Sequence, residues 1–258
     1  MRKPTAMDVE LTILKGEERR FFKKRTGQKD SKLNQFLVEK VPDTLQNTLS
    51  TAFAKAFGLI FEKGTGLIEK TYRKEELEQT YQAAMEEEQN WKTLRGFSKR
   101  AGKAGNTNLL VSGAAGIGMG TLGVGIPDIP VFTAMMLRSL YEIAIHYGYD
   151  YASEAERRFI LLLIQGGVSY GEKLQSIDKE LNEYIVLGCW QNEAEMEGLI
   201  RDTARCLSGE LLYMKFLQGT PIVGAVGGAY DAIYMKRINE YAELKYRRRF
   251  YTEHKSKS

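Results

Sequence analysis

Residues 104–127 read AGNTNLLVSGAAGIGMGTLGVGIP, a run of 24 residues without a charged side chain, of which seven are glycine. The run is long enough to cross a bilayer as a helix. Each glycine, however, costs about 1 kcal/mol relative to alanine in a helix interior, so this many must serve close packing or an irregular path. The segment therefore predicts either a membrane contact or a tight contact between helices. The glycines expected to form this packing or insertion face are Gly113, Gly116, Gly120 and Gly123.

Two prolines end this run, in the sequence Pro127-Asp128-Ile129-Pro130. Neither proline suits a helix interior, and each restricts the residue before it, so the segment predicts a hairpin between two helices. The second arm, residues 131–147, carries apolar residues at helical spacing and stops at Gly148, as a helix C-terminus does. The next helix, residues 154–166, is apolar almost all round, which indicates a buried position.

A second glycine-rich segment, residues 219–229, reads GTPIVGAVGGA and leads into a further helix that continues through Tyr241. It repeats the composition of the first segment: a glycine-rich turn followed by an amphipathic helix. Its expected packing or insertion residues are Gly224, Gly227 and Gly228.

On the N-terminal side, the periodicity predicts helices over residues 43–60 and 74–99. Proline is scarce, and helix-forming residues dominate the periodic stretches. We therefore expect an all-α fold, a single multi-helix domain over residues 31–250 with two glycine-rich helix-hairpin segments. Residues 1–30 are rich in charge and predict a mobile or marginally helical basic leader, and residues 251–258 a charged tail.

The formal net charge of +4 results from 37 basic and 33 acidic residues, a balance that does not favour a nucleic-acid partner. The basic residues gather at the two ends of the chain. Either cluster is suited to anionic lipid headgroups, and solvated helix faces are the alternative interpretation. The N-terminal cluster contains Lys15, Arg19, Arg20, Lys23, Lys24 and Arg25, and the predicted headgroup contacts of the C-terminal cluster are Lys245, Arg247, Arg248 and Arg249.

Known catalytic and cofactor motifs are missing or lack their context. Gly118–Gly123 has the G-x-G-x-x-G spacing of a dinucleotide site, but Gly125 and Pro127 interrupt the helix that such a site requires. The two histidines and two cysteines are not in metal-ligand spacing, and no G-x-S-x-G elbow occurs. We therefore expect no cofactor and no metal, and we assign no catalytic residue.

Four residues form a candidate polar site: Asp128, Arg138, His146 and Asp231. Asp128 either caps the following helix or, if the hairpin inserts, reaches water or a protein-lined cavity. Arg138 is expected to pair with Asp128 or with a neighbouring acid. His146 lies near a helix C-terminus, where the dipole favours its charged form, so a structural role is favoured over catalysis.

The chain resembles the EcsC family of bacterial proteins over roughly residues 35–250. The resemblance rests on the glycine-rich run ending in Gly-Ile-Pro-Asp-Ile-Pro130, on Tyr141-Glu-Ile-Ala-Ile-His-Tyr-Gly-Tyr-Asp150, on the helix 154–164, and on Pro221-Ile-Val-Gly-Ala-Val-Gly-Gly-Ala229. The family is named after a protein encoded beside an ABC transporter, and the resemblance implies a helical accessory protein without catalytic residues to transfer. One departure is Asp231, where many members carry asparagine.

We predict the first of three functional classes, a non-enzymatic accessory protein, bound peripherally to the membrane and linked to an ABC transporter or another membrane process. The other two classes are kept as alternatives. The second is a soluble enzyme with a pocket near Asp128 and Asp231, and the third is a soluble helical scaffold without lipid contact. Residues 1–30 contain no apolar signal segment, which predicts a cytoplasmic protein, located for the first class on the inner face of the cell membrane. Expected partners are an anionic membrane surface and a transporter or other protein.

Overall fold

The structure is a computed structural model that describes residues 6–25, 39–69, 73–86, 129–192, 194–217 and 228–255, with residues 32, 35 and 36. The elements in these ranges are helices, and no strand occurs among them, which confirms the all-α prediction. The α-helices are α1 (Ala6–Lys23), α3 (Asp43–Leu59), α4 (Thr65–Glu69), α5 (Lys74–Glu86), α7 (Ile129–His146), α8 (Glu154–Val168), α9 (Gly171–Leu187), α10 (Met196–Leu217) and α11 (Gly228–Lys255), and the π-helical turn η1 (Ile60–Gly64) joins α3 to α4.

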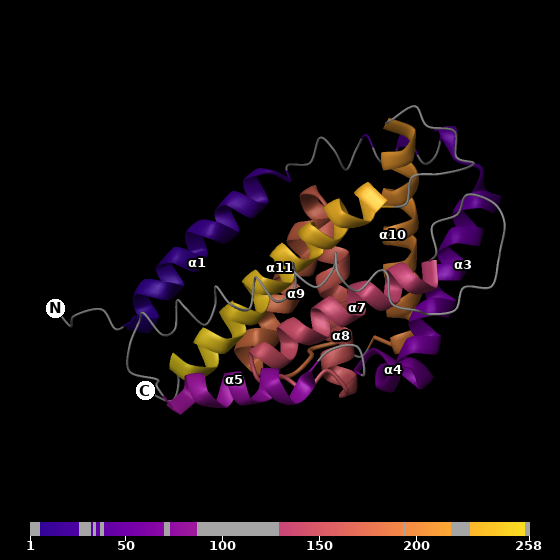
Figure 1. Cartoon of the computed structure of the whole chain (residues 1–258). Coiled ribbons are helices and arrows are strands. Elements are labelled where there is room, and N and C mark those ends of the chain that lie inside the picture. Colours follow the sequence, from indigo (N-terminus) through magenta and orange to yellow (C-terminus); the bar gives the residue numbers. More distant parts are fainter. Residues whose placement is uncertain are drawn as a thin grey trace.

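Helix α8 is buried, as its sequence predicts, and forms the centre of the fold. It packs against α9, α10 and α11, and all residues from Phe159 to Val168 are buried. Its N-terminus is capped by Ser153, whose hydroxyl accepts a hydrogen bond from the Glu156 amide at 3.2 Å. Around this centre, α3 packs on α10 and on α7, and α5 packs on α7. Figure 1 shows α1 along one outer side of the molecule and α3 on the opposite side.

A pair of glycines in α8 allows α11 to approach closely. A Cβ atom on Gly167 would lie 2.7 Å from the Cα of Ile238, and one on Gly166 would collide with the ring of Tyr241. The absent side chains thus let the backbones of the two helices come together. A close contact between helices therefore lies at Gly166 and Gly167. The sequence predicted Gly166 at the end of a buried helix and did not assign Gly167.

The predicted helix 131–147 is confirmed as α7, and the predicted C-terminal glycine, Gly148, has a φ of 81°. Helix 43–60 corresponds to α3, which Asp43 begins without a side-chain cap. Of the predicted helix 74–99, α5 accounts for residues 74–86, and the remainder lies outside the described residues.

Helices extend beyond both ends of the predicted domain, residues 31–250. Residues 6–23, which we expected within a mobile or marginally helical leader, form α1, because Leu14 and Phe21 bury an apolar stripe at helical spacing on the rest of the fold. Residues 251–255, expected in a charged tail, continue α11, and Tyr251 is fully buried. The ordered unit therefore includes α1 and the end of α11.

The two glycine-rich segments lie mostly outside the described residues, so the hairpins predicted there remain predictions. This applies to Gly113, Gly116, Gly120, Gly123, Gly224 and Gly227, whereas Gly228 is the first residue of α11. None of the helices in the described ranges has the length and hydropathy needed to span a bilayer.

Candidate functional site

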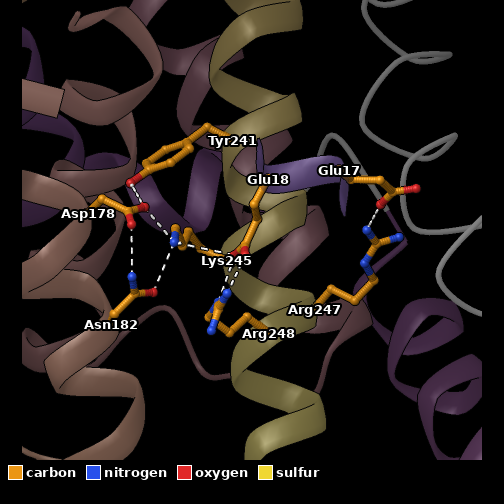
Figure 2. A network of polar contacts seen from close by, with 8 residues as sticks. All are labelled: Glu17, Glu18, Asp178, Asn182, Tyr241, Lys245, Arg247 and Arg248. Carbon is orange, nitrogen blue, oxygen red and sulfur yellow. Dashed lines mark hydrogen bonds and ion pairs between the residues drawn. The ribbon is translucent and has the colours of Figure 1, made fainter. Parts of the chain in front are cut away.

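A cluster of polar side chains fastens α1 to α9 and α11 (Figure 2). We call it the α1 clamp. It combines three acidic and three basic residues with one amide and one phenol: Glu17, Glu18, Asp178, Asn182, Tyr241, Lys245, Arg247 and Arg248. The clamp joins residues up to 230 positions apart in the sequence.

Lys245 of α11 lies at the centre of the clamp and is 0% exposed. Its Nζ lies 2.5 Å from Asp178 Oδ1, 2.9 Å from Asn182 Oδ1 and 3.5 Å from Glu18 Oε1. Asp178 also accepts hydrogen bonds from the Tyr241 hydroxyl and from the Asn182 amide, each at 2.8 Å. Burial and the nearby Asp178 carboxylate raise the pKa of Tyr241, which keeps its phenol protonated as a donor. Lys245 thus has the three oxygen partners that a buried ammonium requires.

Two arginines of α11 extend the clamp along α1. Arg248 donates to both carboxylate oxygens of Glu18, with 2.7 Å between Nε and Oε1. These hydrogen bonds raise the pKa of Arg248, and such a two-point contact fixes orientation as well as position. Arg247 pairs with Glu17, and Figure 2 shows this pair on the opposite side of Lys245 from Asp178 and Asn182. Helix α1 is therefore held on two sides.

The C-terminal end of α1 has additional attachments. Phe21 is buried and stacks on Tyr241, with 5.0 Å between ring centroids. The carbonyl of Arg25 accepts a hydrogen bond from the Gly171 amide at 3.1 Å, which ties the end of α1 to the start of α9. The guanidinium of Arg25 lies 3.4 Å from the centroid of the Phe21 ring, and burial lowers its pKa to about 10. The rotation of α1 about its own axis is thus fixed.

The fixed rotation of α1 directs its acidic residues inward and most of its basic residues outward. Glu18 is buried and Glu17 partly buried, whereas four of the five bases that follow them lie at the surface, Arg25 being the buried one. The exposed basic residues of α1 and the turn after it are Lys15, Arg19, Arg20, Lys23 and Lys24. We call these five residues the basic face of α1, and the clamp fixes the direction in which this face points.

The four C-terminal bases that we assigned to lipid headgroups already have acidic partners within the protein. Lys245, Arg247 and Arg248 belong to the clamp. Arg249 donates to Glu156 at 2.7 Å and to Glu253 at 3.1 Å. Their contact with lipid stays untested, but in this arrangement their charges hold helices together.

The candidate polar site is brought together only in part. Arg138 pairs with a neighbouring acid on its own helix, Glu142, at 2.9 Å. His146 is the last residue of α7 and is buried, with its ring edge against Tyr147. Asp128 and the side chain of Asp231 lie outside the described residues. Among the residues that the structure describes, no group of His, Cys, Asp and Glu is arranged to hold a metal ion.

The acidic half of the clamp was not predicted. Glu17 and Glu18 lie within a basic cluster, and their charge was outweighed by the surrounding lysines and arginines. A signal was present, because Leu14, Glu18 and Phe21 follow one another at i, i+4 and i+7 and so share one helix face. An acid in the middle of an apolar stripe indicates a buried ion pair.

These features define an all-α protein whose N-terminal helix is docked through buried ion pairs. The sequence model of the EcsC protein family matches residues 10–250, most of the chain, so the protein belongs to this family. The matched range begins within α1, which agrees with α1 being part of the ordered fold.

The chain is also similar to the uncharacterized protein YdbA of Bacillus subtilis (strain 168). The two are 28% identical over 144 residues, which covers 55% of this chain and 53% of YdbA, so the chain aligns with about half of the length of this relative. No solved structure matches the chain.

Proposed function

We propose that this protein is a non-enzymatic accessory protein that binds peripherally to the anionic inner face of the cell membrane. The observation that carries the proposal is the basic face of α1. Five exposed bases lie within one short helix and its following turn, and the clamp holds that helix in one orientation. In this proposal the C-terminal bases act indirectly, because they position α1 and its basic face contacts the headgroups.

The physical basis is electrostatic. A lysine or arginine close to an anionic leaflet contributes about 1 kcal/mol of attraction, and several on one rigid face act together. Two of the acids of α1, Glu17 and Glu18, lie next to these bases in the sequence and are engaged by Arg247, Arg248 and Lys245. In the same proposal, the glycine-rich segments add helix packing or shallow insertion, and a membrane transporter or other membrane protein is the partner served.

The test is flotation of the purified protein with liposomes of neutral or partly anionic composition, at low and high salt. The wild type is expected to float with anionic liposomes at low salt and to lose much of that binding at high salt, since salt screens surface charge. The double variant Arg19→Gln with Arg20→Gln removes two exposed charges from α1. Because each charge contributes about 1 kcal/mol of attraction, their loss is expected to weaken flotation about tenfold or more.

The matched control replaces two exposed arginines of α10, Arg201 and Arg205, by glutamine. It changes the net charge by the same amount on another helix and is expected to leave flotation nearly unchanged. Equal loss in both double variants would mean that overall charge, and not the α1 face, drives binding. A wild type that never floats would refute the proposed membrane attachment.

A further inference from the structure

A groove of about 560 Å³ runs between the end of α1 and the outer side of α9. Phe22 lines it from α1, and Lys179, Glu183, Val186 and Leu187 are among the residues that line it from α9. Its inner wall includes Asp178 and Asn182, which belong to the α1 clamp. The groove is therefore a direct product of the way in which the clamp docks α1.

Two neighbouring aliphatic side chains at one end of the groove are unusually exposed. Val186 is 71% exposed and Leu187 is 54% exposed. They are the last two residues of α9, which Gly188 ends with a φ of 73°. Isolated exposed apolar residues are common on protein surfaces, but an adjacent pair at a helix end, beside a groove, forms a small apolar patch.

The α1 side of the groove is rimmed by basic residues. Lys15, Arg19 and Phe22 follow one another at i, i+4 and i+7, so they share one stripe of the helix, and Lys23 lies beside it. Because Phe22 faces the groove, this spacing places Lys15 and Arg19 along the same edge. On the α9 side, the exposed carboxylate Glu183 has the ammonium of Lys179 at 3.9 Å.

We propose that this edge is the part of the protein that enters the membrane surface, with Val186 and Leu187 inserted among the acyl chains of an anionic bilayer. We call these residues, together with Phe22, Lys15, Arg19 and Lys23, the insertion edge. The inference rests on the proposed function and adds the location and mode of contact. Interfacial binding to anionic lipid combines buried apolar area with basic residues at headgroup level, and the insertion edge presents both.

The insertion edge makes a prediction that a purely electrostatic face does not make. High salt removes the attraction between the bases and the headgroups, but it does not weaken the burial of Val186 and Leu187 in the acyl region. A fraction of the binding is therefore expected to survive high salt, and that fraction is expected to depend on Leu187.

Leu187→Ser and Leu59→Ser form a matched pair for the test. Leu59 is 57% exposed and is the last residue of α3 before the π-helical turn η1, so each variant makes the same change at an exposed leucine. Figure 1 shows α3 on the side of the molecule opposite α1. In flotation at high salt with anionic liposomes, Leu187→Ser is expected to lower binding roughly tenfold, from the loss of one buried leucine, and Leu59→Ser to lower it little.

The second measurement reports depth. A nitrobenzoxadiazole label is attached at Leu187→Cys, and in a second protein at Leu59→Cys, each with Cys189 and Cys206 replaced by serine. The label at position 187 is expected to shift its emission to the blue and gain intensity with anionic vesicles, and the label at 59 to remain unchanged.

Flotation of the wild type with equal behaviour of the two leucine variants, or with no spectral change at position 187, would overturn the insertion edge and leave the proposed function standing. A wild type that does not float under any condition overturns both. Circular dichroism of each variant confirms that the helices are retained, as expected for changes at exposed positions.

Discussion

Replacing Lys245 by methionine tests whether the α1 clamp holds the fold together. Methionine keeps much of the aliphatic length of lysine but leaves Asp178, Asn182 and Glu18 without the ammonium that they share. The Lys245 side chain is 1% exposed and those of Glu18 and Asp178 are 9% and 16% exposed, so water does not easily replace the lost partner. Removing one member of a buried ion pair costs about 3–5 kcal/mol. We expect the free energy of unfolding to fall by that amount.

The assay is urea denaturation monitored by circular dichroism, with native-state hydrogen exchange to locate the effect. Lys179→Met is the control, because that lysine is 78% exposed and its pair with Glu183 spans 3.9 Å. Such a surface pair contributes about 0–1 kcal/mol. Faster exchange in the Lys245 variant should be concentrated in α1. If Lys245→Met and Lys179→Met change stability equally, or if the α1 amides keep their protection, the clamp does not hold α1.

Two further predictions concern packing and pH. Gly167→Ala is expected to lower the free energy of unfolding by about 1–3 kcal/mol, because the new Cβ would meet the Ile238 backbone. Gly16→Ala is expected to raise it by about 0.5–1 kcal/mol, because a Cβ at this helical position has open space. Urea denaturation of the two variants measures both changes. Burial raises the pKa of Glu243 to about 8, against the weaker opposing effect of its hydrogen bond from Tyr147. Between about pH 4.5 and 8 the folded state therefore binds more protons than the unfolded state, so stability should fall as pH rises through this window. In Glu243→Gln, the free energy of unfolding should fall less steeply with pH over this range. Equal pH slopes in the variant and the wild type would contradict this prediction.

The helices were predictable where the evidence was local. The apolar pattern of residues 131–147 and the stop at Gly148 correspond to α7, and the run from Phe159 to Ile164 corresponds to the buried α8. Local sequence carries these features because helical periodicity and a left-handed C-terminal glycine depend on neighbours a few residues apart.

The clamp was not predictable in the same way, because it joins the two ends of the chain. Glu18 and Lys245 are 227 positions apart, and nothing near either residue identifies the other. The sequence showed two basic clusters of similar composition. It did not show that the bases of α11 would meet the acids of α1, so both clusters were assigned to the same lipid surface.

This pairing explains how two similar clusters take different roles. The charged side chains of α11 are buried or partly buried, and a buried charge is stable only beside an opposite charge. Helices α1 and α9 supply these opposite charges as Glu17, Glu18 and Asp178. On α1, the acids that satisfy α11 are turned inward by the same contact, so the outward face retains mainly bases. The bases of α11 therefore fix the position of the exposed bases of α1. In the proposed membrane contact, the insertion edge therefore depends on residues of α11 that do not themselves belong to that edge.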